Sequence, residues 1–361
     1  MPIQNVISAP EDTIQIGLEP TLNALQSLLL LTQADDLSGL GDWVIRTDQA
    51  LSQEQRQRHF LVMIGFYNIV IPHRSWSNFA SYLEQLKSMS PLQMRDTLME
   101  TYLKMPCKQG TTDDLQNAKE TALASQENYL QFLRERFDEM HIFPEVEKQA
   151  YRYLQDPPVM KDLVVSHLQS MWDQFLAPEW QRVKPMLQES VEAFRRLDYS
   201  GLSKLEAARL ITGHKFDEEK WITHMDMAEQ VLFVPNSHIG PYTGVFHVKD
   251  KLVLFFGARH PDGVFQEAPD LSRAEILVRL SALADDSRLR ILKYISENGE
   301  QRSQDIMQAL DLSQSAASRH LKQLSATGYL NERRCEGAKC YDLNPERLDD
   351  TLQAIRSFLL M

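Results

Sequence analysis

The sequence predicts a mainly α-helical protein: a helical N-terminal domain with a small antiparallel sheet, followed by a C-terminal domain of short helices and a β-hairpin. Three observations support this fold class. Apolar residues recur at steps of three and four along much of the 361-residue chain, as in amphipathic helices. Three β-branched and aromatic runs gather at 230–256. A stretch with two prolines and a glycine, 258–272, then precedes a second series of helical patterns.

Residues 13–258 are expected to form the N-terminal domain, after a flexible tail at 1–12. Pro20 and Pro91 stand where helices should begin, because proline is favoured in a first turn. The expected elements are a strand at 13–18, helices at 21–32, 53–70, 76–89, from 91, at 112–140 and onward to 197, helices at 204–212 and 217–225, and strands at 230–234, 244–248 and 252–256. The last two strands should form a hairpin with its turn at 249–251.

The helix expected at 112–140 has the clearest pattern. Its apolar residues recur at steps of three, four or seven on one face, and Thr112 or Asp113 would cap it. The residues of this face are Leu115, Ala118, Ala122, Tyr129, Leu133, Phe137 and Met140.

A linker is expected at 259–270 and a C-terminal domain at 271–361. Its helices should lie at 271–283, 288–297, 304–310 and 316–327, before a hairpin of 329–334 and 339–343 and a last helix at 346–360. The candidate helix caps are Asp285, Asp286 or Ser287, then Ser303, then Ser313 or Ser315. This order is that of a winged helix-turn-helix, in which the helix after the tight connection enters the major groove of DNA.

The charge distribution agrees with a local DNA-binding surface. The chain carries a net charge of −12, which disfavours non-specific adhesion to nucleic acid. Within 313–341, however, there are five basic residues and only two acidic ones. Positive charge is therefore concentrated in the predicted groove-binding helix and hairpin.

Eight side chains in this stretch are the candidate DNA-binding residues. Ala317, Leu321 and Leu324 repeat at helical spacing and should face the core, which turns the polar side chains of their helix outward. Glutamine and arginine can bond base edges, whereas serine hydroxyls and lysine suit phosphates. The candidates are Gln314, Ser315, Ser318, Arg319 and Lys322 on the helix, and Arg333, Arg334 and Lys339 on the hairpin.

Three segments carry a family resemblance. ALADDSRLRILKYI (282–295), QDIMQALDLSQSAASRHLKQLSATGYL (304–330) and CYDLNP (340–345) together resemble the ArsR/SmtB family of winged-helix repressors, over about a quarter of the chain. The resemblance implies a homodimer on a palindromic operator in double-stranded DNA, paired through the helices at 271–283 and 348–360. The apolar stripe of the last helix supports this pairing, with the alternative that the stripe packs only within its own domain. Its residues are Leu348, Leu352, Ile355, Phe358 and Leu359.

The N-terminal domain resembles that of a larger subgroup of such regulators, in APEWQRVKPML (177–187) and LFVPNSHIGPY (232–242). This resemblance implies no known ligand, but a dimerisation or sensory role with a small-molecule effector is expected. Both common metal sites of the family are missing: 300–310 has no cysteine or histidine, and 345–359 has no histidine. The sequence therefore predicts no metal and no cofactor.

The three cysteines, Cys107, Cys335 and Cys340, are too few for a disulfide framework and suggest a reducing compartment. Cys335 and Cys340 should face each other across the hairpin, either as a redox switch or as small strand residues. No secretory segment and no membrane-length apolar run is visible, so a cytoplasmic location is expected.

Other candidates have plain structural alternatives. His320 could touch phosphate or pack within the domain. A metal cluster is less expected than scattered packing for His214, His238, His247 and His260. Core packing is likewise favoured over a ligand pocket for Trp172, Trp180, Trp221, Phe175, Phe216 and Phe233.

Two other functional classes remain open for the chain: an enzyme that carries a winged-helix passenger domain, or a protein-interaction module. No G-x-S-x-G, P-loop or G-x-G-x-x-G motif is present, which argues against an enzyme. The basic residues of the predicted groove-binding helix and hairpin favour DNA over a protein partner.

Overall fold

A computed structural model describes residues 13–105, 107–108, 115–139, 142–214, 216, 218–261, 273–335 and 337–360. The chain divides into two compact units. The sheet unit comprises the described residues up to Leu18, Gln33–Ile45 and those from Val183 onward, and the helical unit comprises Glu19–Thr32 and Arg46–Arg182. The predicted tail at 1–12 and most of the predicted linker at 259–270 lie outside the described residues, so these boundaries stay predictions.

The helical unit is built from consecutive helices, several of which begin at a proline or a capping serine. Ser52 and Ser90 accept hydrogen bonds from the backbone of the third residue of α3 and α6. The elements are α1 (Pro20–Leu31), α3 (Gln53–Phe60), the π-helical turn η2 (Leu61–Gly65), α4 (Tyr67–Val70), α5 (Phe79–Ser88), α6 (Pro91–Leu103), α7 (Leu115–Ala124), α8 (Gln126–Arg134), α9 (Pro144–Leu154), α10 (Pro157–Met171) and the π-helical turn η4 (Trp172–Leu176). Two further helices, α2 (Asp42–Ala50) and α11 (Ala177–Arg195), have residues in both units.

The prediction of one helix at 112–140 is wrong. The chain forms α7 and α8 instead, because Ser125 adopts an extended conformation and its side chain accepts a hydrogen bond from Asn128 N at 3.1 Å. A serine at this position ends one helix and caps the next without disturbing the apolar spacing. The predicted caps, Thr112 and Asp113, lie outside the described residues.

Two polar pairs are buried in the helical unit. His59 Nδ1 and His167 Nε2 are 2.9 Å apart, and His59 Nε2 lies 2.8 Å from Leu28 O. Elsewhere, Tyr129 donates a hydrogen bond of 3.3 Å to Glu147, whose carboxyl group is only 6 % exposed. Burial raises the pKa of Glu147 to about 7, since the charged form loses water there.

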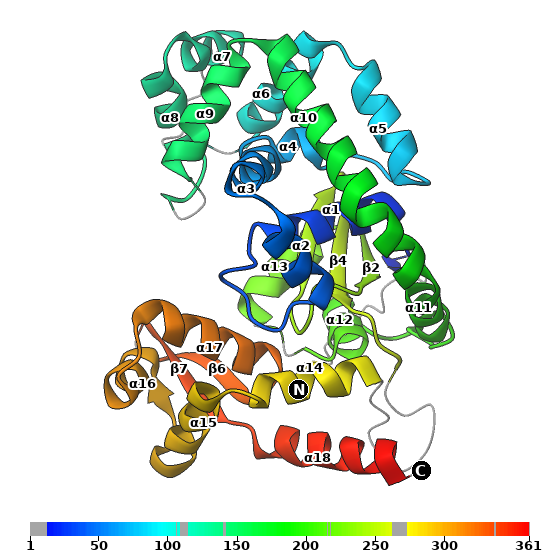
Figure 1. The fold of residues 1–361 in the computed structure, drawn as a ribbon, viewed down its shortest axis with the longest axis vertical. Helices are drawn as coiled ribbons and strands as arrows, with labels where there is room; N and C mark the ends of the chain where they lie inside the picture. The colour runs from blue at the N-terminus through cyan, green and yellow to red at the C-terminus, as the bar shows by residue number, and fades with distance from the viewer. Residues whose placement is uncertain are drawn as a thin grey trace, which may run out of the picture. The chain divides into compact units, whose positions relative to one another are not determined.

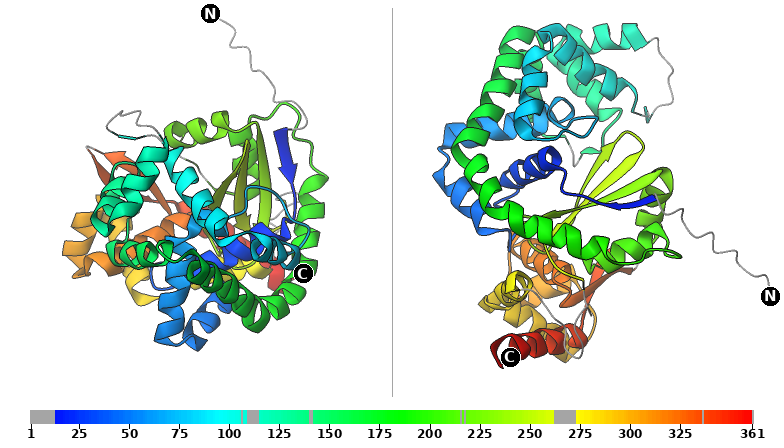
Figure 2. Two further views of the ribbon diagram at one scale, coloured as in Figure 1. Left: turned by 90° about the horizontal axis from the view of Figure 1, so that it is seen from above. Right: turned by 90° about the vertical axis from the view of Figure 1, so that its right-hand side faces the viewer.

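The sheet unit contains a four-stranded mixed sheet, with strand order β1-β2-β4-β3. The strands are β1 (Ile14–Ile16), β2 (Gln230–Asn236), β3 (Gly244–Val248) and β4 (Lys251–Gly257). β1, β2 and β4 run parallel, and β3 pairs antiparallel with β4 across a turn at Lys249 and Asp250. Figure 2 shows β1 in blue at the edge of the sheet.

The antiparallel sheet predicted from the sequence is therefore wrong in two of its three pairings, and only the hairpin is confirmed. β2 and β4 are buried along nearly their whole length. Strands of that kind have continuous apolar runs instead of alternating ones, which is typical of parallel sheets. Helices α12 (Lys204–Thr212) and α13 (Glu218–Met227) share their apolar core with this sheet.

The winged domain follows within the same unit, and its predicted element order is confirmed. It consists of α14 (Arg273–Leu283), α15 (Asp286–Asn298), β5 (Gln301–Arg302), α16 (Ser303–Leu310), α17 (Gln314–Ala326), β6 (Leu330–Cys335), β7 (Ala338–Leu343) and α18 (Pro345–Leu360). Asp285 caps α15 and Ser313 caps α17. Ser303 is not a cap as predicted, because it is already helical and Arg302 holds the cap position.

The core of the winged domain fixes the orientation of α17. Leu321 and Leu324 are buried together with Ile291, Ile306 and Tyr329. A fully buried leucine stabilises a fold by about 2 kcal/mol, so this face of α17 is strongly held inward. Figure 1 shows α14 and α18 side by side, and Ile276 and Ala354 are buried between them.

Within the described residues, no helix is both long and apolar enough to cross a membrane.

Candidate nucleic-acid interface

Helix α17 presents the five predicted side chains to solvent. Ser313 Oγ accepts a hydrogen bond from Ala316 N at 3.3 Å and starts the helix. The apolar residues predicted to face the core are indeed buried. The polar face is exposed at Gln314, Ser315, Ser318, Arg319 and Lys322. The geometry thus forms one polar surface on α17, which we call the α17 ridge.

His320 lies on the same helix but belongs to the interior. Its side chain is 9 % exposed, and its Nδ1 lies 3.8 Å from Asp285 Oδ1. Burial, with smaller effects of Arg288 and Arg319, lowers the pKa of His320. The structural alternative therefore holds for this residue, and the phosphate-contact alternative is wrong.

The pKa of Lys322 depends on charged groups of the wing and of a segment distant in the sequence. Burial lowers its pKa, Asp36 opposes that effect, and Lys339 of the wing adds to it. The segment Gln33–Ile45 also approaches the buried side of α17, where a Cβ at Gly39 would come within 2.8 Å of Gln323 Nε2. Sequence reasoning missed this segment, because no local pattern reveals such a long-range contact.

The cations of the wing are exposed, but two of the three have carboxylate partners. Arg333 donates two hydrogen bonds to Glu300, and Lys339 Nζ lies 2.6 Å from Glu332 Oε1. Arg334 has no carboxylate among the described residues within ion-pair distance. Glu332 and Lys339 are diagonal neighbours in the register of β6 and β7, but Glu300 precedes β5, a strand that the sequence did not predict.

Cys335 and Cys340 face each other across the hairpin, as predicted, and are joined in a disulfide. Together with Glu300 they form the one group of three metal-ligand atoms found among the described residues, within 4.8 Å of one another. The sulfurs are bonded to each other and Glu300 is engaged by Arg333, so these atoms are occupied within the protein.

The histidine and aromatic candidates are mainly packing residues. His238 stacks on Trp43 with ring centroids 4.8 Å apart, and Trp172 stacks on Phe79 with ring centroids 4.7 Å apart. Phe216 and Trp221 meet edge to face in the core beside the sheet. The four histidines form no group of three ligand atoms in the described part of the chain.

Helices α14 and α18 expose apolar side chains. Leu277 is 56 % exposed, and Leu352 and Phe358 are 64 % and 54 % exposed. Leu348 and Ile355 of the same predicted stripe pack partly against their own domain. The stripe is therefore divided between an internal contact and an uncovered surface.

Part of the winged domain is similar to known proteins. The model described as "Bacterial regulatory protein, arsR family" matches residues 285–332, from the cap of α15 into β6. The arsenic resistance transcriptional regulator ArsR1 of Pseudomonas putida is 44 % identical over 64 residues, which are 18 % of this chain and 50 % of that protein. The chain thus spans about half the length of the curated relative it matches. No solved structure matches the chain.

Proposed function

We propose that the protein is a sequence-specific DNA-binding transcriptional regulator that acts as a repressor, starting from the match of residues 285–332 to the arsR family of bacterial regulatory proteins. The observation that carries the proposal is the α17 ridge, whose five polar side chains are all exposed beside a cationic wing. A regulator of this kind acts in the cytoplasm, where the DNA lies.

Each side chain of the surface has a role that suits its chemistry. Gln314 and Arg319 read base edges in the major groove, since both can form bidentate hydrogen bonds with bases. Lys322 and the hydroxyls of Ser315 and Ser318 bind phosphates, which position the domain without reading sequence. The wing, with Arg333, Arg334 and Lys339, follows the backbone or the adjacent minor groove.

The regulator acts as a homodimer in this proposal. The support is the uncovered apolar surface of α14 and α18, where Leu277, Leu352 and Phe358 are more than half exposed. Contact with the same surface of a second copy would remove these side chains from water. The operator should then be roughly palindromic, with half-sites about 10 bp apart or a multiple of that.

A gel-shift experiment with genomic DNA fragments at two salt concentrations tests the proposal. Wild-type protein should shift a subset of fragments at low salt and bind much more weakly at high salt, because released counterions drive phosphate binding. The double variant Arg319→Ala/Lys322→Ala should lose the shift. Lys293→Ala, which removes an exposed cation of α15, is the matched control and should behave as wild type.

Two results would overturn the proposal. An enzyme or a protein-interaction module would shift no fragment at either salt concentration. Equal shifts by wild type and by the double variant would show that the α17 ridge is not the DNA-binding surface.

A further inference from the structure

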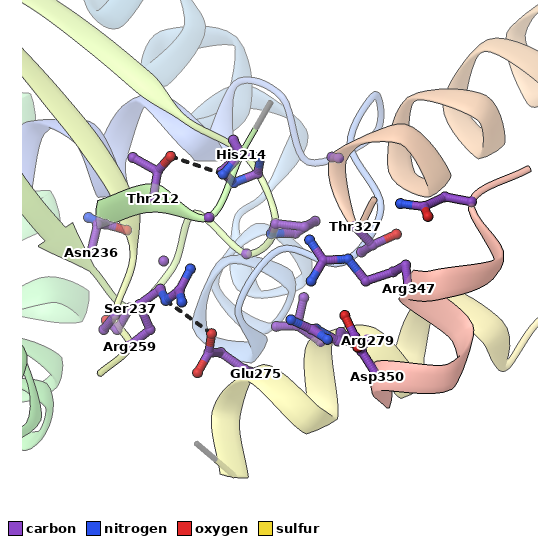
Figure 3. A pocket seen from close by; sticks show the side chains of 18 of the residues that line it. Thr212, His214, Asn236, Ser237, Arg259, Glu275, Arg279, Thr327, Arg347 and Asp350 are labelled. Carbon is purple, nitrogen blue, oxygen red and sulfur yellow. Dashed lines mark hydrogen bonds and ion pairs between the residues drawn. The ribbon is translucent and has the colours of Figure 1, made fainter. Parts of the chain in front are cut away.

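A cavity of about 350 Å³ lies inside the sheet unit, away from the α17 ridge. One side is formed where the parallel strands β2 and β4 end, at Asn236 and Gly257, and the other by α14 and α18 (Figure 3). Its size is within the range of small-molecule sites. Ligands of open sheets commonly bind beyond the carboxyl ends of parallel strands.

Two arginines from the winged domain line this cavity without an ion-pair partner among the described residues. Arg279 of α14 and Arg347 of α18 are half-buried and point into the same part of the cavity (Figure 3). Arg279 Nη1 is buried without a hydrogen-bond acceptor. Burial, with Arg347 as the next cause, lowers the pKa of Arg279 to about 10, and Glu275 opposes this shift. Two guanidiniums therefore share one space, and in the described part of the chain neither has a carboxylate within ion-pair distance.

The backbone makes room for the cations of this site. Gly328 has a φ of +82°, and a Cβ there would lie 2.6 Å from Arg347 Nε. Gly213 ends α12 with a φ of +69°, and a Cβ there would lie 2.0 Å from Arg259 Nη1. Arg259 is buried and lies 3.2 Å from Glu275, so it is already balanced. A side chain at either glycine would displace an arginine from the cavity wall.

The acidic residues of the wall form no ion pair with Arg279 or Arg347. Glu275 pairs with Arg259, and Glu346 and Asp350 are exposed. Asp350 lies beside the two arginines in Figure 3 but forms no ion pair with them. A cationic ligand held against Arg279 and Arg347 would meet two like charges, so these two groups favour an anion.

The rest of the wall adds hydrogen-bonding and apolar groups. Burial, with Arg259 and Arg347 contributing, lowers the pKa of His214 to about 4, so its ring is neutral near pH 7. Ser237 Oγ is buried with no hydrogen-bond partner among the described residues. Met186, Pro241 and Val278 supply apolar surface. The wall thus suits a molecule with one anionic group and a small apolar body.

We propose that this cavity binds a small organic anion, a carboxylate or a phosphate ester, whose oxygens are held by the guanidiniums of Arg279 and Arg347. Arginine binds both anion types through two parallel N–H···O bonds, so the shared chemistry is that of an oxyanion. Binding gives the two guanidiniums the direct anionic partner that they do not have among the described residues.

A consequence for regulation rests on the proposed function. The cavity wall includes α14 and α18, the proposed dimer helices, and Thr327, at the end of α17. An anion that bridges these elements binds one arrangement of them better than another, and it shifts the protein toward that arrangement. The cavity is therefore the effector site of the regulator.

Isothermal titration calorimetry of the full chain tests the binding proposal without DNA. The probes are benzoate, phenyl phosphate and inorganic phosphate, with benzamide as the neutral match for benzoate. Wild type should bind at least one of the organic anions and not benzamide, and the stronger of the two identifies the preferred anion. Arg279→Gln and Arg347→Gln should weaken that binding by about ten- to a hundredfold, as expected for a lost charged hydrogen bond.

Two controls separate ligand binding from a structural role. Arg356→Gln removes an exposed arginine of α18 that does not line the cavity, and it should bind as wild type. Without ligand, Arg347→Gln should melt at or above the wild-type temperature, because the repulsion with Arg279 is gone. A structural arginine would instead lower the melting temperature. If the glutamine variants fold poorly, Arg347→Lys keeps the charge and should still weaken binding, since lysine lacks the planar fork.

The proposal is overturned if wild type binds neither organic anion at tens of millimolar, whether or not it binds inorganic phosphate, or if the variants bind as wild type. The regulatory consequence has its own test: the bound anion should change the DNA affinity of wild type and leave that of Arg347→Gln unchanged. Because the added salt raises the ionic strength equally for both proteins, the difference between them reports only the effect of the bound anion. A protein that binds the anion but no DNA would refute the proposed function and leave the anion site standing.

Discussion

In the proposed complex with DNA, Arg319 is the side chain on which recognition of the base sequence depends most. It is exposed on α17 while its neighbour His320 is buried, so the helix holds it outward. Arg319→Ala should weaken operator binding by about 1–3 kcal/mol and relax the base preference at one position of each half-site. Competition binding with operators altered at single positions measures both effects. Wild-type affinity and base preference in this variant would rule out Arg319 as a reader, with Lys293→Ala as the control.

Glu300 engages one of the wing cations proposed to bind DNA. It accepts two hydrogen bonds from Arg333 and raises the pKa of that guanidinium. Glu300→Gln should therefore release Arg333 and strengthen DNA binding a few-fold, with a steeper dependence on salt because one more phosphate contact forms. Fluorescence anisotropy at several salt concentrations measures this. Weaker DNA binding by Glu300→Gln would contradict this prediction and show instead that the ion pair of Glu300 and Arg333 positions the wing for DNA. Glu297→Gln, which removes a carboxylate paired with Lys293 on α15, is the control.

Glu147 gives the helical unit a dependence on pH. Its pKa is about 7 in the folded protein, against an ordinary value of 4.5. Between those values the folded protein keeps the proton and the unfolded chain releases it, so stability falls as pH rises. The loss should reach about 3 kcal/mol by pH 8.

Comparison of wild type with Glu147→Gln isolates this effect. The pKa values of His59 and His167 are lowered to about 4 and about 3. The free energy of unfolding therefore falls as pH drops below 6.5, and it falls equally in wild type and in the variant. The difference in unfolding free energy between variant and wild type should therefore grow in favour of the variant from pH 5 to pH 8. Parallel stability curves over that range would contradict the assignment.

At the scale of elements, the uncovered surface of α14 and α18 makes the sharpest prediction. Leu352→Glu and Phe358→Glu should shift the protein from dimer to monomer, because each places a charge in the proposed apolar interface. Sedimentation velocity measures the change. Leu92→Glu, at an exposed leucine of α6, should leave the oligomeric state unchanged. A wild-type monomer, or variants that still dimerise, would contradict a dimer built on these helices.

The elements also show what the sequence could and could not predict. The order of helices and the hairpin of the winged domain were predictable, except for the cap at Ser303 and strand β5, since most capping residues and the apolar spacing agree with its final packing, as at Ser313 and Leu321. The same apolar spacing predicted the polar face of α17. The direction of the strands in the larger sheet could not be predicted in this way, because the parallel pairing of β2 and β4 joins strands that are not consecutive along the chain.

Single capping residues and contacts between distant segments account for the other differences between the predicted and the observed structure. Ser125 divides an apolar pattern that reads as one helix, and its effect depends on backbone geometry rather than on hydrophobicity. The pairing of Arg333 with Glu300 requires the short strand β5, which is too brief to leave a periodic signal. The cavity arginines come from α14 and α18, so only the folded structure shows that they meet.

For the whole molecule, the proposal places a small DNA-binding surface on an acidic chain. The net charge of −12 opposes general attraction to DNA, so in this proposal binding comes from the α17 ridge and the wing. Two copies related by symmetry would present two such surfaces to consecutive grooves. Specific contacts made by both copies would then allow the proposed dimer to recognise a site in a genome.

The most direct measurement is the DNA sequence that the purified protein enriches from a random pool. We expect an inverted repeat with half-sites about 10 bp apart or a multiple of that, and a loss of preference at one base of each half-site when Arg319→Ala is used. Enrichment of no sequence, or of the same sequence by wild type and variant, would contradict this expectation.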